Sequence, residues 1–276
     1  MHFTKYNGLG NDFIFLDGQT ALSVKDPAAL ARKLCNRRTG IGADGLVLLL
    51  ASQVADVRMR IFNSDGSEAE MCGNASRCVP LHLLKNGFTK QKKCTLETLA
   101  GLIETEVLNE HKGIVRVNMG TPRTTRGAVP MTGKPEESSI NISVKLGNQK
   151  ITGTGVSMGN PHFVIVVDNA ETAPVAERGP QLETNAAFPQ KTNVEFVQII
   201  DKHTVRMRVW ERGAGITQAC GTGSCATAAA CILNGLTASP VTVQLDGGEL
   251  TIEWPQQRDI WMTGPAQKVF EGEIAL

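Results

Sequence analysis

The sequence predicts an α+β fold made of two pseudo-symmetric halves, each a central helix wrapped by mostly antiparallel strands. Three observations predict it: a repeat that relates the halves, alternating segments typical of strands, and a helix at the same place in each half. The chain has 276 residues, enough for two domains of about 140 residues. We expect an N-terminal half at 1–119, a C-terminal half at 120–266, and a last segment, 267–276, that returns to the N-terminal half.

The repeat is seen when the chain is shifted along itself by 148 residues. At almost the same shift Gly10-Asn11 meets Gly159-Asn160, and each of these pairs leads into an apolar run that ends in aspartate. The repeat therefore covers most of each half. The pairs aligned by the shift are VRMRIF (57–62) with VRMRVW (205–210), Cys72-Gly73 with Cys220-Gly221, and Asn86-Gly87 with Asn234-Gly235.

Each half contains the same order of predicted elements. In the first half, residues 57–62 alternate as in a strand, a turn follows at 63–66, and a helix runs from Cys72 to Leu84. In the second half, the small residues from Gly221 to Leu233 favour a buried helix. Asn-Gly pairs end both helices, and hairpin turns follow at Ala100-Gly101 and at 246–248. Cys72 and Cys220 therefore sit at helix N-termini.

Composition and charge exclude several classes of protein. The formal net charge is +1, so the chain lacks the basic excess that a nucleic-acid-binding surface needs. The longest apolar runs fall well short of the ~20 residues that a bilayer requires, and the first residues do not resemble a signal peptide. Seven cysteines, an odd number, do not form a secreted disulfide framework. We therefore expect a cytoplasmic protein with reduced thiols and no membrane or nucleic-acid partner.

The matched cysteines point to a chemical function, although a duplication kept only for folding remains the alternative. A pseudo-two-fold axis would bring Cys72 and Cys220 face to face around one ligand. Helix N-termini bind carboxylates through unpaired backbone amides, and they lower a thiol pKa whereas burial raises it. One thiolate and one thiol could then remove and return the proton of a carbon acid, inverting its stereocentre. The backbone donors would come from Gly73, Asn74, Gly221 and Thr222, with no metal, pyridoxal phosphate or other cofactor.

Four long segments then carry a specific resemblance. In order and spacing along essentially the whole chain, the sequence resembles the diaminopimelate epimerases. The resemblance implies a cofactor-independent isomerase of lysine biosynthesis that converts LL-2,6-diaminopimelate to the meso form with two cysteines. It also implies a cleft that closes on this small-molecule substrate and, usually, a homodimer. The segments are GLGNDF (8–13), RIFNSDGSEAEMCGNASRC (60–78), SMGNPHFV (157–164) and ERGAGITQACGTGSCA (211–226).

The same resemblance implies roles for individual residues. Cys72 and Cys220 would be the acid/base pair, with His162 and Glu211 adjusting their protonation. A second group would hold the unreacted amino-acid end of the substrate, which needs a fixed cation and neutral amides. This group consists of Arg212, Asn11, Asn63, Asn160 and Asn193.

Two positions depart from the family pattern. Gly45 stands where some members have a glutamine that contacts the substrate, and Ile216 stands where an acidic residue is common. Neither change removes a cysteine, an asparagine or the arginine. A racemase or epimerase of another amino acid on the same fold therefore stays open.

Three other classes of function fit these observations less well. The glycines at 40–45 match a dinucleotide-binding fingerprint, but a helix precedes them and a strand follows, which reverses the required order. The cysteine spacings fit a zinc site poorly. A thiol–disulfide oxidoreductase is the stronger rival because facing thiols can oxidise to one another, although no C-x-x-C motif supports it.

Overall fold

The computed structural model describes residues 1–275 as two compact units. Unit 1 comprises Met1–Asn118 and the segment from Thr263 onward, and unit 2 comprises Met119–Met262. The chain passes between the units twice, within β8 (Ile114–Gly120) and within β17 (Ile260–Pro265). Unit 2 is therefore one uninterrupted stretch of chain, whereas unit 1 is built from both ends of the sequence.

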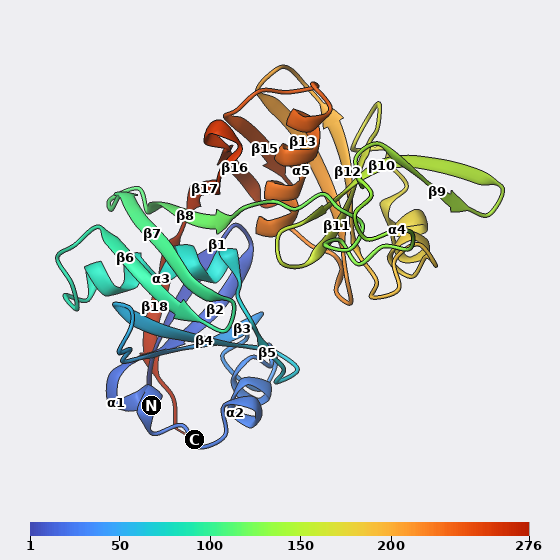
Figure 1. Ribbon diagram of the computed structural model, residues 1–276. Helices are drawn as coiled ribbons and strands as arrows, with labels where there is room; N and C mark the ends of the chain where they lie inside the picture. Colours follow the sequence, from blue (N-terminus) through green and yellow to red (C-terminus); the bar gives the residue numbers. More distant parts are fainter. Residues whose placement is uncertain (276) are drawn as a thin grey trace. The chain divides into compact units, whose positions relative to one another are not determined.

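Unit 1 is a mixed sheet around one long helix (Figure 1). Neighbouring strands pair antiparallel except β2 with β3 and β4 with β6, which pair parallel. Its helices are α1 (Gly18–Leu22), α2 (Pro27–Leu34) and α3 (Gly73–Lys85). Its strands are β1 (His2–Gly8), β2 (Asn11–Leu16), β3 (Gly45–Leu50), β4 (Val57–Asn63), β5 (Glu68–Ala69), β6 (Lys93–Thr98), β7 (Gly101–Asn109), the first part of β8, and β18 (Gln267–Glu273).

Unit 2 repeats this plan. Here too most neighbours are antiparallel, and the parallel pairs, β11 with β12 and β13 with β15, hold the places of the two parallel pairs of unit 1. Its helices are α4 (Val175–Glu183) and α5 (Gly221–Leu233), with a 3₁₀ turn at Pro255–Gln257. Its strands are β9 (Ile142–Leu146), β10 (Gln149–Ser157), β11 (Pro161–Val166), β12 (Asn193–Ile199), β13 (Thr204–Glu211), β14 (Gly215–Ile216), β15 (Val241–Leu245) and β16 (Gly248–Glu253). The predicted α+β fold is confirmed.

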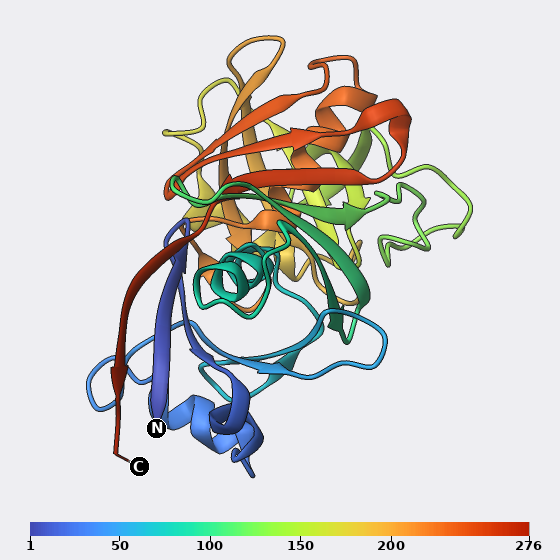
Figure 2. The same cartoon turned by 90° about the vertical axis from the view of Figure 1, so that its left-hand side faces the viewer.

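The central helices form where the sequence predicts them. Cys72 is the N-cap of α3 and Cys220 is the N-cap of α5, and asparagines follow both helices as C-caps. Nearly all of α5 is buried, because glycine, alanine, serine, threonine and cysteine let strands approach its backbone from several sides. Figure 2 shows α3 and α5, each among the strands of its own unit. The hairpins predicted around Ala100-Gly101 and at 246–248 join β6 to β7 and β15 to β16.

Both ends of the chain belong to unit 1. Strand β1 pairs antiparallel with β2 on one side and with β18 on the other, and the N-terminal amine of Met1 donates to the carbonyl oxygen of Ile274 at 2.8 Å. Of these three strands, β1 lies in the middle and comes first in the sequence, whereas its neighbour β18 comes last. In residues 1–275, no helix combines the length and the apolar character needed to cross a membrane.

Candidate active site

Cys220 is held at the start of α5, where strand-like backbone angles turn into the helix. Its sulfur accepts a hydrogen bond from the backbone amide of Gly223 at 3.3 Å and lies 3.6 Å from the hydroxyl oxygen of Thr222. Only 4% of the residue is exposed. The first amides of a helix have no partner within the helix, so those of Gly221 and Thr222 are the orphan donors next to this thiol.

Burial raises the pKa of the Cys220 thiol well above its ordinary value, and the charges of Glu211 and Glu195 raise it further. The hydrogen bonds from Thr222 and Gly223 lower the pKa and do not outweigh these effects. The sequence predicts two opposing effects on the pKa of this thiol: the helix N-terminus lowers it and burial raises it. In the structure, burial has the stronger effect. Cys220 is therefore a protonated thiol at neutral pH, which is the form that can donate a proton.

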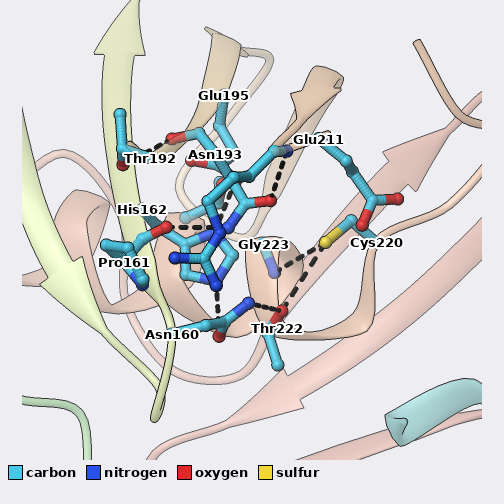
Figure 3. A network of polar contacts seen from close by, with 12 residues as sticks. Asn160, Pro161, His162, Thr192, Asn193, Glu195, Glu211, Cys220, Thr222 and Gly223 are labelled. Carbon is cyan, nitrogen blue, oxygen red and sulfur yellow. Dashed lines mark hydrogen bonds and ion pairs between the residues drawn. The ribbon is translucent and has the colours of Figure 1, made fainter. Parts of the chain in front are cut away.

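His162 lies in β11 and is fully buried. Its Nδ1 is 2.6 Å from Oε1 of Glu195 in β12, and its Nε2 is 3.0 Å from Oδ1 of Asn160 (Figure 3). The Asn160 amide nitrogen donates to the Thr222 hydroxyl at 3.3 Å, and that hydroxyl is the one beside the Cys220 sulfur. His162 thus reaches the thiol through Asn160 and Thr222, rather than by a direct contact.

Asn193 links two more of the predicted residues in unit 2. Its side-chain nitrogen donates to the carbonyl oxygen of Pro161 at 2.7 Å, and its side-chain oxygen accepts from the backbone amide of Arg212 at 2.9 Å (Figure 3). The exposed Arg212 guanidinium donates to the carbonyl oxygen of Gln190 at 3.1 Å. Glu211, the neighbour of Arg212, accepts a hydrogen bond from the Thr217 hydroxyl. Unit 2 therefore brings its predicted site residues into one polar cluster.

In unit 1, Cys72 is half-buried at the start of α3, followed by the buried first-turn residues Gly73 and Asn74. The Asn74 amide nitrogen donates to the side-chain oxygen of Asn11, and the Asn11 amide nitrogen donates to Asp44 at 3.1 Å. Unit 1 thus also brings predicted residues, the two asparagines, together at the N-terminus of its central helix.

Asn63 ends β4 and is exposed. Its side-chain nitrogen donates to the Ser67 hydroxyl at 2.9 Å, across the turn predicted at 63–66. It pairs across the sheet with Gly45, the first residue of β3. A Cβ atom at Gly45 would lie 3.1 Å from the carbonyl oxygen of Phe62, so the backbones pack tightly at this departure from the family pattern. Ile216, the other departure, is exposed in β14.

A charged network that the sequence does not reveal supports Asn11. The buried ammonium of Lys5 lies 2.7 Å from Asp12, and Arg37 makes ion pairs with both Asp12 and Asp44. Burial acts to raise the pKa of Asp12, but the hydrogen bonds from Arg37 and Lys5 outweigh it and lower the pKa to about 2. The Asp12 carboxylate is therefore charged at all physiological pH values and fixes the turn that carries Asn11.

Glu195 is the residue of the site that sequence reasoning missed. It is a carboxylate inside the apolar strand Asn193–Ile199, and it is fully buried. The signal was present, because the 148-residue shift aligns Glu195 with the apolar Val47. A charged residue at the counterpart of a core valine needs a polar partner, and His162 is that partner.

The other five cysteines, Cys35, Cys78, Cys94, Cys225 and Cys231, are buried, which is typical of cysteines that pack as small apolar residues. The glycines at 40–44 form a loop between α2 and β3. Across residues 1–275, no group of three or more His, Cys, Asp or Glu side chains is arranged to hold a metal ion.

Several known proteins are similar to this chain in sequence. The sequence profile described as diaminopimelate epimerase matches residues 3–125 and 154–269. A diaminopimelate epimerase of Pelotomaculum thermopropionicum is 51% identical, covering 99% of this chain and 98% of its own. One of Elusimicrobium minutum is 50% identical, with coverage of 99% and 98%.

Solved structures share the fold at low identity. A probable proline racemase of Agrobacterium radiobacter superposes with a TM-score of 0.73 at 18% identity, covering 100% of this chain and 93% of its own. A hydroxyproline epimerase of Agrobacterium vitis gives 0.72 at 17%, with coverage of 100% and 92%. With the profile covering most of the sequence and relatives at half identity over its full length, the chain belongs to the diaminopimelate epimerase family and is an isomerase.

Proposed function

We propose that this chain interconverts LL-2,6-diaminopimelate and meso-diaminopimelate by proton transfer between Cys72, Cys220 and one α-carbon. The observation that carries the proposal is the equivalence of the two cysteines, each the N-cap of the central helix of its unit. One sulfur, as thiolate, takes the proton when the Cα–H bond breaks. The other, as thiol, gives a proton to the opposite face. The two thiols exchange protonation states in each turnover, and no group is oxidised or reduced.

Backbone amides at the helix N-termini would stabilise the carbanion. As the Cα–H bond breaks, negative charge moves onto the carboxylate next to the reacting carbon. First-turn amides and the positive end of a helix dipole are preorganised for such charge, and they are more effective where water is excluded. We assign this role to the amides of Gly73, Asn74, Gly221 and Thr222.

The distal end of the substrate carries a second carboxylate and ammonium. Arg212 supplies an exposed guanidinium, the group best suited to pair with a carboxylate in two hydrogen bonds. Neutral amides that both donate and accept suit the ammonium and would leave unpaired groups against the wrong stereoisomer. We assign this role to Asn11, Asn63, Asn160 and Asn193, and assign to His162 and Glu211 the adjustment of thiol protonation.

We further propose that the enzyme works in the cytoplasm as a homodimer. Support for the compartment comes from seven cysteines that are all free thiols. Support for the dimer comes from β18, where Val269 and Phe270 are about half exposed beside β1. Light scattering coupled to gel filtration tests the dimer, and a monomer at all concentrations would refute it.

The decisive test of the reaction uses solvent deuterium. Purified, reduced protein is incubated in deuterated water with LL-diaminopimelate and no added cofactor, and the product is analysed for stereochemistry and isotope. We expect meso product with one deuterium at the inverted α-carbon, because a thiol proton exchanges with solvent. Absence of inversion, or inversion that retains the original hydrogen, would refute the proposal.

The same assay separates the alternatives. A panel of L-amino acids is tested beside diaminopimelate, and faster inversion of another member would replace the substrate assignment while keeping the two-thiol chemistry. A dithiol–disulfide exchange assay tests the redox class. Turnover there, without α-proton exchange, would replace the proposal altogether.

A further inference from the structure

Glu195 is buried where a carboxylate is costly. It has no exposed surface, and within residues 1–275 its Oε2 atom has no hydrogen-bond partner. Its other oxygen, Oε1, lies 2.6 Å from Nδ1 of His162. Burying an incompletely satisfied carboxylate costs several kcal/mol of folding free energy, so its presence calls for a reason other than folding.

Unit 1 shows that the fold does not need this pair. His162 lies opposite Asn193 in the β11–β12 ladder, and Glu195 is two residues further along β12. At the same places in the β2–β3 ladder, Phe13 lies opposite Gly45, and Val47 is two residues further along β3. Both Phe13 and Val47 are core residues of unit 1. The same scaffold thus accepts an apolar pair where unit 2 carries an acid and a base.

Proton positions in the pair follow from its contacts. The Asn160 amide nitrogen donates to Thr222, which leaves the Asn160 oxygen to accept from His162, so Nε2 carries a hydrogen. The remaining bond, between Nδ1 and Glu195, contains one further proton, whichever of the two atoms holds it. Glu195 therefore fixes the form of His162 that donates toward Asn160.

We propose that Glu195 is a positioning residue for proton transfer by Cys220. It holds the Nε2–H of His162 on Asn160, and this orients the Asn160 amide and the Thr222 hydroxyl beside the sulfur. The inference rests on the proposed role of Cys220 in the reaction. Figure 3 shows the full line of contacts from Glu195 to Cys220.

The pair also acts on the thiol through charge. The titratable groups around Cys220 are Glu195 on β12, Glu211 on β13 and, beyond Glu195, His162 on β11. Both carboxylates favour the protonated thiol. Burial also raises the pKa of Glu195. His162 lowers this pKa, but its effect is smaller than that of burial. Removing the Glu195 carboxylate should therefore make Cys220 ionise at lower pH.

Gly223 shows that the helix has been adapted to this carboxylate. A Cβ atom there would lie 2.8 Å from Oε1 of Glu195 and 3.1 Å from the Cys220 sulfur. The 148-residue shift aligns Gly223 with Ala75 in α3, which faces no carboxylate at the position of Val47. Glycine thus leaves room for Glu195 three residues after Cys220.

The test replaces Glu195 in graded ways. Glu195→Val introduces the unit 1 residue, Glu195→Gln keeps a hydrogen bond to His162 without the charge, and Thr227→Val removes a buried hydroxyl of α5 elsewhere as the matched control. We expect Glu195→Val to lower kcat about 100-fold with KM changed less than threefold, a size typical of lost acid–base catalysis. Glu195→Gln should recover most of this loss, and the control should keep the wild-type kcat.

A second measurement follows the thiol itself. The rate of Cys220 alkylation is measured against pH by mass spectrometry of the alkylated peptide, which requires no substrate. We expect the pH midpoint of Cys220 alkylation to fall by about one pH unit in Glu195→Val and Glu195→Gln and to stay unchanged in Thr227→Val. A buried residue with only a structural role would not move this midpoint.

A double variant covers the case in which Glu195→Val fails to fold. His162→Phe combined with Glu195→Val installs the complete unit 1 pair, so it should fold at least as stably as the wild type and have as little activity as Glu195→Val. Wild-type kcat in either variant, or an unmoved alkylation midpoint, would overturn the inference. Neither result touches the proposed function, which fails only if the wild type does not invert diaminopimelate through its cysteines.

Discussion

The two units share one scaffold but carry their charged side chains at different places on it. In unit 1 the charged groups, Lys5 and Asp12 among them, form a network with Arg37 at the turn that carries Asn11. In unit 2 that turn has a proline, Pro161, and the acid–base pair of His162 and Glu195 is fully buried. A duplicated scaffold fixes where backbone groups and helix ends lie. It leaves each half free to carry different side chains on that scaffold.

The largest effect is expected from replacing the feature that the two units share, the cysteine at the N-terminus of each central helix. Cys72→Ala and Cys220→Ala should each lower kcat/KM by about 10²–10⁴-fold, because each removes one proton-transfer group. Circular dichroism and thermal unfolding would show whether each variant keeps the wild-type fold. A wild-type rate in either variant would mean that the two cysteines are equivalent in position only.

The next effect concerns the network found only in unit 1. Asp12→Asn leaves the buried Lys5 ammonium without its carboxylate and should lower the free energy of unfolding by about 3 kcal/mol. Urea denaturation measures it. The matched control is Glu106→Gln, which breaks the partly exposed pair with Arg116 and should cost at most about 1 kcal/mol. Equal losses would mean that the network contributes no more than a surface ion pair.

The same carboxylate makes unit 1 sensitive to acid. The folded-state pKa of Asp12 is about 2, below the unfolded value of about 4. Its contribution is therefore complete above about pH 4 and is lost as the pH falls toward about 2. Hydrogen exchange across this range should show lost protection in β1 and β2, and a pH-independent pattern there would contradict the shift.

A smaller effect tests the fit between α5 and Glu195. Gly223→Ala gains about 1 kcal/mol of helix propensity, but its Cβ would lie 2.8 Å from the carboxylate, so we expect a net loss of about 1–3 kcal/mol. In the Glu195→Val background the loss should shrink by about 1 kcal/mol. Urea denaturation of the two single variants and the double variant measures this coupling. If their effects on the free energy of unfolding simply add, Gly223 and Glu195 do not interact.

The smallest effect compares the two thiols directly. Cys72 is half-buried and Cys220 is buried with a raised pKa, so at neutral pH iodoacetamide should alkylate Cys72 about tenfold faster. Peptide mass spectrometry measures both rates in one sample. Faster labelling of Cys220 would reverse the assignment of the more protonated thiol.

The repeat explains how much of this was predictable. The two central helices, their N-cap cysteines and the hairpins that follow them could be predicted because each appears twice, and the second copy supports the first. His162 and Glu195 are 33 residues apart, and only the parallel pairing of β11 with β12 brings them together. Lys5, Asp12 and Arg37 meet in the same way, through tertiary contacts. Strand β9 lies before the stretch that the repeat covers, so no second copy indicated it.

The pairing of β1 between β2 and β18 has a consequence for synthesis. Unit 2 is complete once Met262 has left the ribosome, whereas β1 must wait for the final strand, which begins at Gln267. The half translated second can thus mature before the half translated first. A released chain that lacks β18 would have a complete unit 2 and an incomplete unit 1, and the unpaired edge of β1 would be open to pairing with strands of other chains.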